Sequence, residues 1–284
     1  MGKLLDIVSD LHKVPSMQPR FLLLLLLSSA HFACGQAPAA ADAKDAKPRW
    51  DAAELQKSIR KISDTEFALG EIKINAETKT VSFPATLKIV KGPLEYLIVN
   101  EAGSAHEALF MTKVNAFELN VALLLTGFKP SETFFRKTKP DSFPEVVKGA
   151  KIAPESSFTV VVDWTDEEGK PRTNSAEDWV YNLDSKATAT PGAWAYTGSM
   201  LNQNGDLAAQ VSGNILALYV DANALANNPR LGNDNDDIWT SKPEHPKEGL
   251  PVTITLKMAS ASEKAPNKPA NPPSKSPEPA KKKS

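Results

Sequence analysis

The chain has 284 residues, a formal net charge of −1 and a single cysteine, Cys34. A near-neutral chain with no recognisable nucleic-acid module is not typical of nucleic-acid-binding proteins. One cysteine allows no internal disulfide bond and excludes an iron–sulfur cluster, which needs several thiolates. The stretch 50–258 is long enough for one domain with a single hydrophobic core.

Residues 1–35 have the order of a secretory signal peptide. Arg20 precedes the apolar stretch 21–33, small residues follow it, and the stretch is shorter than the roughly 20 residues of a permanent transmembrane helix. Asp6 and Asp10 lie where a signal peptide is short and basic, so Met17 is a candidate for the true start of translation. The sequence therefore predicts an exported protein.

Two fates of Cys34 remain open. Ala33 precedes it, as in lipoproteins whose cysteine is lipidated and becomes the new N-terminus. Alternatively, cleavage after Gly35 or Ala39 would remove it. Either fate is consistent with a bacterial envelope location. Lipidated Cys34 would anchor the domain to the outer membrane or cell surface, and cleavage would leave it in the periplasm.

The two segments that flank the domain are predicted to lack a fold. The Ala-rich, polar stretch 36–49 would be a flexible tether. The stretch 259–284 contains six prolines, six lysines and two glutamates, a formal charge of +4, and it has too few large apolar residues to offset the entropy of ordering. This disordered tail is either simply solvated or docks on an anionic surface such as a wall polymer or phospholipid headgroups.

The first half of the domain is predicted to be mostly β-structure. An amphipathic pattern over 50–62 indicates a short helix, and alternating apolar residues on either side of the turn 75–79 indicate a β-hairpin. Further strands are expected at 87–90, 94–99 and 106–112, the first two separated by Gly92-Pro93.

One buried helix is predicted over about 115–127. Asn115 can cap its start, Gly127 ends it and Pro130 follows, which is the usual order at a helix C-terminus. Apolar residues occur on most of its faces, so it should be buried on most sides.

The second half of the domain adds strands and one short helical segment, 221–226. The strands are expected at 157–164, 171–174, 194–200, 207–211, 214–220 and 252–256. Many short strands with one strong helix favour a single α+β domain with a mainly antiparallel sheet.

His106 is the histidine expected inside the fold, and it has two interpretations. As a catalytic base, acid or metal ligand it would need a carboxylate partner. Glu107 is adjacent but should point to the opposite face of a strand, so Glu95, on the preceding strand of a hairpin, is the alternative partner. Otherwise His106 is a partly buried residue with a structural hydrogen bond.

The acidic run 233–237 is the second candidate site. Carboxylate and amide oxygens are the ligands that Ca²⁺ prefers, and Asp234, Asp236 and Asp237 could supply them. The spacing is not that of an EF-hand, and the alternative is an Asx-rich turn. Ca²⁺ is the one cofactor that the sequence suggests.

Three tryptophans, Trp179, Trp194 and Trp239, could hold a sugar, but core packing is the expected role of large aromatic side chains. Carboxylates lie beside some tryptophans in the sequence, yet nothing fixes a pair of them at the separation that a glycosidase needs.

Six short segments occur in an order and spacing that resemble a known family: Gly-Pro-Leu-Glu-Tyr-Leu at 92–97, His-Glu-Ala-Leu-Phe at 106–110, Ala-Leu-Leu-Leu-Thr-Gly-Phe at 122–128, Ala-Glu-Asp-Trp at 176–179, Trp-Ala-Tyr-Thr-Gly-Ser at 194–199 and Asn-Ile-Leu-Ala-Leu at 214–218. The chain resembles the YdjY-type domain family of bacterial exported proteins over about 71–256. The resemblance implies no firm activity. Some members carry a ferredoxin-like label, which does not transfer to a domain without cluster ligands.

These features favour a non-enzymatic binding or interaction module tethered to the cell envelope, whose ligand would be an envelope polymer or a protein. The alternative is an envelope hydrolase or other enzyme that uses His106 with Glu95 or Glu107. No nucleic-acid partner is expected.

Overall fold

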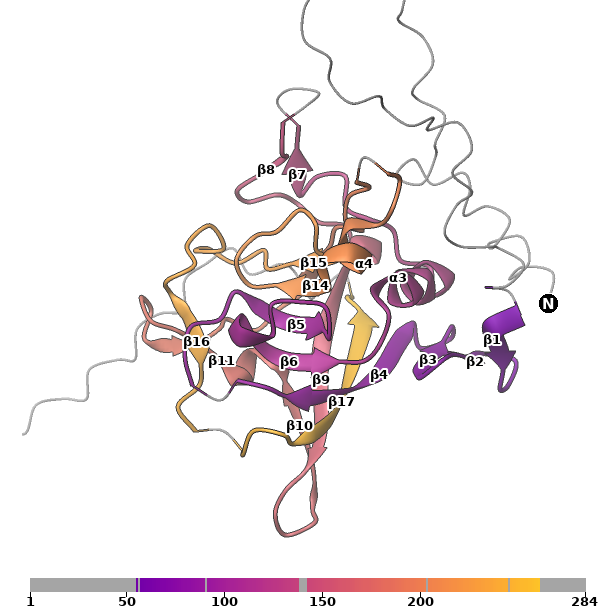
Figure 1. The fold of residues 1–284 in the computed structure, drawn as a ribbon, viewed down its shortest axis with the longest axis horizontal. Coiled ribbons are helices and arrows are strands. Elements are labelled where there is room, and N and C mark those ends of the chain that lie inside the picture. Colours follow the sequence, from indigo (N-terminus) through magenta and orange to yellow (C-terminus); the bar gives the residue numbers. More distant parts are fainter. Residues whose placement is uncertain are drawn as a thin grey trace, which may run out of the picture.

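A closed β-barrel forms the centre of the protein. The computed structural model describes residue 55 and residues 57–89, 91–137, 142–202, 204–244 and 246–260 (Figure 1). Within these residues one sheet has twelve strands, and eight of them close into a barrel in the order β4, β17, β9, β13, β15, β14, β5, β6. Pairing of β6 with β4 closes the ring. The α+β architecture with a mainly antiparallel sheet was therefore wrong.

The barrel strands are β4 (Thr80–Leu87), β5 (Tyr96–Asn100), β6 (Ala108–Thr112), β9 (Ser157–Thr165), β13 (Trp194–Tyr196), β14 (Asn214–Ala217), β15 (Ala226–Asn227) and β17 (Pro251–Met258). The sheet continues beyond β4 through β3 (Ile72–Asn75), β2 (Glu66–Leu69) and β1 (Ile59–Lys61), and β10 (Pro171–Ser175) pairs with β9. Two small sheets stand apart: β11 (Val180–Asn182) with β12 (Ala187–Thr188) and β16 (Trp239–Ser241), and β7 (Phe135–Arg136) with β8 (Glu145–Val146).

Two strand pairs in the ring are parallel, β5 with β6 and β14 with β15. The predicted hairpin between the strands of Glu95 and His106 was therefore wrong. The connection from β5 to β6 passes close to the residue before β14, and Gly103 and Gly213 are in contact there. A Cβ added to Gly103 would lie 2.8 Å from the carbonyl oxygen of Gly213, and one added to Gly213 would lie 2.3 Å from the nitrogen of Gly103. Only residues without a Cβ allow this approach.

Alternating side chains fill one continuous core. In β17, Val252, Ile254 and Leu256 are buried while the residues between them are exposed or half-buried, as period-two strands require. Large side chains such as Phe83 and Phe110 join the same apolar cluster. Each fully buried side chain of this size contributes about 1.5–3 kcal/mol through the hydrophobic effect.

Two α-helices lie side by side above β4 and β17 in Figure 1: α3 (Ala116–Leu125) and α4 (Ala208–Ser212). The Asn115 side chain caps α3 by accepting hydrogen bonds from the backbone N–H groups of Phe117 and Glu118. Seven of the ten residues of α3 are buried, so the predicted capped and buried helix is confirmed. None of the described helices has the length and apolar character needed to span a membrane.

Other predicted elements met mixed outcomes. The hairpin around 75–79 and the strands near 157–164, 171–174 and 252–256 are confirmed. The predicted strand 207–211 is instead mostly α4, and the predicted strand 87–90 contributes only the last residue of β4. The segment 221–226 forms turns rather than a helix. In the predicted helix 50–62 the described residues Leu55, Lys57 and Ser58 are helical, but the chain then continues as β1. The signal peptide, the tether 36–49, the fate of Cys34 and nearly all of the tail lie outside the described residues.

Candidate functional site

His106 lies on a 3₁₀ turn, η3 (Ala105–Glu107), immediately before β6 rather than on a strand. Its side chain is 78% exposed, and its Nε2 lies 3.6 Å from Oε1 of Glu107. Neighbouring side chains do not alternate on a helical turn, so the expectation that these two point to opposite faces was wrong. The separation is longer than the roughly 2.7–3.2 Å of a hydrogen bond, and the imidazole is free to reorient in solvent.

Glu95 lies beside these residues, as predicted, although through parallel rather than hairpin strands. Its backbone N–H donates to the carbonyl oxygen of Glu107 at 3.0 Å. Partial burial raises the pKa of the Glu95 carboxyl, and the negative charges of Glu107 and Asp236 raise it further, while the charge of His106 opposes them. Two regions that the sequence treats separately, the His-Glu step and the acidic loop, therefore share one electrostatic environment.

Tyr96 and Asp221 form a polar contact next to Glu95 that the sequence analysis did not identify. The Tyr96 hydroxyl donates to Oδ2 of Asp221 at 3.3 Å, and the Asn214 side-chain amide donates to the same oxygen at 3.2 Å. Burial and the Asp221 charge raise the pKa of Tyr96. Asp221 is thus engaged in holding the loop after β14. Its position in a polar turn gave no signal, because its partners come from distant strands.

An open depression lies at the exposed edge of this region. It is lined by Lys88, Ile89, Lys91, Gly103, Ala105, His106 and Glu248. The Lys88 ammonium lies 3.2 Å from Oε1 of Glu248. The lining holds two lysines and one glutamate, a formal charge of +1, and the Glu107 carboxylate lies beside His106 at its edge. The two ammonium groups are the contacts that this depression offers to an anionic group.

The acidic loop is arranged as a turn. Oδ2 of Asp234 lies 2.7 Å from the Lys148 ammonium, which lowers the pKa of Asp234. The side-chain oxygen of Asn235 accepts a hydrogen bond from the backbone N–H of Asp237 at 3.0 Å. Asp236 and Asp237 are exposed. Across the residues that the structure describes, no three His, Cys, Asp or Glu side chains converge on one point. A Ca²⁺ ion at this loop stays a prediction.

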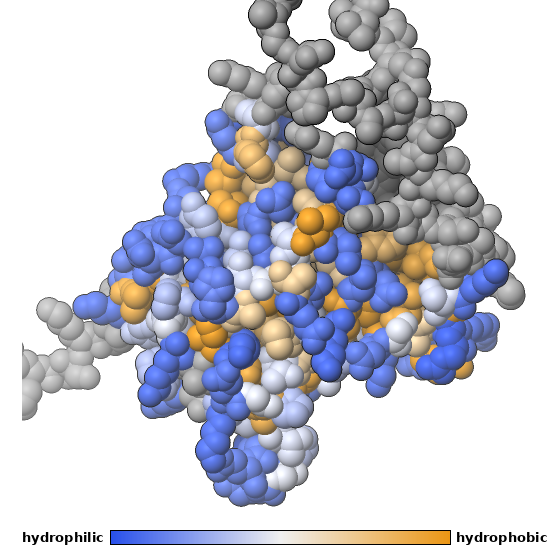
Figure 2. All heavy atoms as spheres, in the orientation of Figure 1, coloured by the Kyte–Doolittle hydropathy of each residue, from blue (hydrophilic) through white to orange (hydrophobic). Residues whose placement is uncertain are grey.

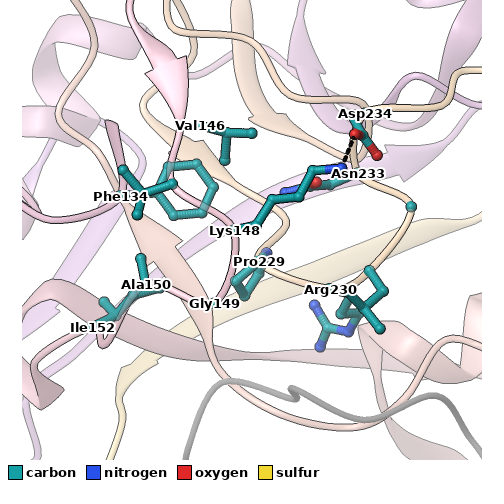
Figure 3. A pocket seen from close by; sticks show the side chains of 13 residues that line it. Phe134, Val146, Lys148, Gly149, Ala150, Ile152, Pro229, Arg230, Asn233 and Asp234 are labelled. Carbon is teal, nitrogen blue, oxygen red and sulfur yellow. Dashed lines mark ion pairs between the residues drawn. The ribbon is translucent and has the colours of Figure 1, made fainter. Parts of the chain in front are cut away.

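A narrow pocket lies behind the Lys148–Asp234 ion pair (Figure 3). Figure 3 shows apolar side chains around it, among them Phe134, Val146 and Ile152. Its volume, about 40 Å³, suits about three waters or a small side chain, since one water needs roughly 10–15 Å³ by this measure. Arg230 forms part of its lining.

Arg230 and Glu177 form an ion pair inside the protein, with side chains only 3% and 4% exposed. Arg230 also donates to the carbonyl oxygens of Thr190 and Gly192 at 2.6 and 2.8 Å. The Trp194 indole N–H donates to the Glu177 carboxylate at 2.8 Å, and the guanidinium lies 4.4 Å from the Trp194 ring centroid. Burial lowers the pKa of Arg230, while Glu177 raises it.

This network fixes the loop that lines the narrow pocket, and the sequence analysis missed it. Glu177 and Arg230 are separated by 53 residues, and although Glu177 lies in the family segment 176–179, neither position has a local pattern that would pair it with the other. Charged residues are rarely buried unless they are paired, so only the fold could reveal the pair.

The three tryptophans are core residues. Trp179, Trp194 and Trp239 are 4%, 0% and 2% exposed. Trp179 packs edge-to-face on Phe110 with ring centroids 5.5 Å apart. Core packing, the expected role, is confirmed, and a sugar could not reach these rings.

Comparison with known proteins gives one match. A family model described as the YdjY domain matches residues 72–257. No curated protein and no solved structure matches the chain significantly. The matched region runs from the first residue of β3 to the penultimate residue of β17, so it includes every strand of the barrel and the surroundings of His106.

Proposed function

The chain belongs to the YdjY domain family, and from that premise we propose that it is a non-enzymatic binding module of the bacterial cell envelope that captures an anionic group in the depression around His106. The observation that carries the proposal is that Lys88, Lys91 and His106 line one open depression whose lining includes one carboxylate, Glu248, with the Glu107 carboxylate beside His106. Ligands with phosphate or carboxylate groups, such as envelope polymers, have the complementary charge.

The connection between β5 and β6 also suits the binding of a polymer. Gly103 and Ala105 form part of the lining, so a bulky polymer meets small side chains where the chain returns from β5 to β6. The contact between Gly103 and Gly213 fixes this return. A ligand that binds a preformed surface loses little affinity to ordering the protein.

Isothermal titration calorimetry with sodium tripolyphosphate tests the proposal, with neutral dextran as the uncharged probe. Lys91→Gln and His106→Gln should each weaken tripolyphosphate binding, by about fivefold if each charge contributes about 1 kcal/mol, as a charge-assisted contact at a partly exposed site does. Lys73→Gln, on the exposed face of β3, is the matched control and should leave binding unchanged. Equal binding by all variants would contradict the proposal.

An enzyme remains the second candidate because the pKa of Glu95 is raised beside His106. A carboxyl with a raised pKa keeps its proton to a higher pH than a free carboxyl, as a general acid requires. Incubation with p-nitrophenyl acetate and p-nitrophenyl phosphate separates the two functions. Turnover that Glu95→Gln and His106→Gln abolish would favour the enzyme, and binding without turnover favours the module.

A further inference from the structure

The β7–β8 hairpin stands apart from the barrel at the top of Figure 1. Phe143, between its two strands, is 73% exposed, more than any other large apolar residue that the structure describes. The base of the hairpin is anchored, because Phe134 is buried and its ring packs edge-to-face on Phe135 at 4.9 Å. A firmly seated hairpin thus holds one large aromatic ring in solvent.

Further apolar residues are exposed near the base of the hairpin. Figure 2 shows apolar residues gathered at the top of the molecule, over the region of β7 and β8, with hydrophilic residues around them. Leu231 is 56% exposed and, together with Val146, lines the narrow pocket at the base of the hairpin. Contiguous exposed apolar groups with a polar rim are typical of interaction surfaces.

The same segment is basic. Residues 129–152 contain six basic and three acidic side chains, a net charge of +3 in a chain whose total is −1. The side chains of Arg136 and Lys148 are 68% and 72% exposed. Their partners Glu145 and Asp234 are exposed too, and ion pairs at such positions contribute little, so the cations can turn toward a new anionic partner.

We propose that the β7–β8 hairpin is a membrane-contact element that docks on an anionic phospholipid bilayer. The Phe143 ring enters the boundary between headgroups and acyl chains, and Arg136, Lys137 and Lys148 contact the headgroups. An exposed aromatic ring on a segment with long basic side chains suits this boundary, where apolar bodies are buried and charged ends stay in water. The proposal does not depend on the ligand of the His106 depression.

Vesicle co-sedimentation tests the hairpin with a chain of residues 36–284, which keeps every described residue and omits the apolar stretch 21–33. The probes are vesicles of phosphatidylcholine alone and vesicles with about 30 mol% phosphatidylglycerol, whose negative surface potential attracts basic side chains. Phe143→Ser should weaken partition by about tenfold, and Lys148→Gln should weaken it by about fivefold, and only on the anionic vesicles. Val211→Ser removes an apolar side chain 56% exposed on α4 and should change nothing.

A second measurement reports insertion directly. Residues 36–284 contain no cysteine, so Ser142→Cys accepts a single environment-sensitive fluorophore beside Phe143. Its emission should shift to the blue on anionic vesicles, while the same label at Glu77→Cys, on the β3–β4 turn, should not respond. Partition that Phe143→Ser leaves intact would show that another segment, such as the basic tail, binds lipid. That result, no shift at position 142, or no binding to anionic vesicles would each overturn the proposal.

Discussion

Arg230→Met should severely destabilise the protein. The side chain of Met fills similar space but cannot donate the four hydrogen bonds that Arg230 makes to Glu177, Thr190, Gly192 and Asn228. Glu177 would stay buried with the Trp194 N–H as its remaining donor in the network. Breaking a buried ion pair by removing one partner costs about 3–5 kcal/mol, a large part of the roughly 5–15 kcal/mol by which domains are stable.

Urea unfolding followed by tryptophan fluorescence measures this loss, because Trp194 lies against the guanidinium. A double-mutant cycle with Glu177→Gln separates the pair from its surroundings. The double variant should be more stable than the sum of the single effects implies, by about 1–3 kcal/mol, since neither charge is then left alone. A loss below about 1 kcal/mol for Arg230→Met, or additivity within about 0.5 kcal/mol, would refute the reasoning.

Three further predictions concern the cap of α3, the Glu95 carboxyl and the acidic loop. Asn115→Ala should lower the free energy of unfolding by about 1 kcal/mol, because two N–H groups lose their acceptor; no loss in urea unfolding would contradict the cap. The raised pKa of Glu95 means that the folded chain holds the carboxyl proton more tightly than the unfolded chain does. The free energy of unfolding therefore falls as pH rises from the ordinary pKa of a glutamate through the raised pKa of Glu95, and it stays reduced above that pH. Glu95→Gln should therefore raise the melting temperature at pH 7 but not at pH 3.5, and a destabilised variant at pH 7 would contradict this. If the acidic loop binds Ca²⁺, the ion should raise the melting temperature of the EDTA-stripped protein and Asp236→Asn should remove this rise; an unchanged melting temperature would contradict the calcium site.

Local sequence patterns located much of the secondary structure. The cap residue Asn115 and the glycine that follows α3 gave the helix, and period-two alternation gave β17. These signals depend on residues within a few positions of one another, so the sequence displays them directly. The predicted strand 207–211 failed because a run of apolar residues that short fits a buried helix as well as a strand.

Barrel closure and the parallel pairs depend on contacts between distant residues. Leu87 pairs with Phe110, and Tyr96 pairs with Ala108, without any mark in local periodicity. The candidate site also depends on contacts between residues that are distant in the sequence. The sequence identified Glu95, His106 and Glu107, and the structure brings them together, but Lys88 and Lys91 joined them only through the fold.

The central claim, capture of an anionic group beside His106, is tested most directly by NMR titration of the protein with tripolyphosphate. The account predicts progressive shifts of the His106 ring protons and of the Gly103 and Lys91 amides as tripolyphosphate is added. Shifts that are spread over surface lysines elsewhere, with His106 and Gly103 unmoved, would contradict it.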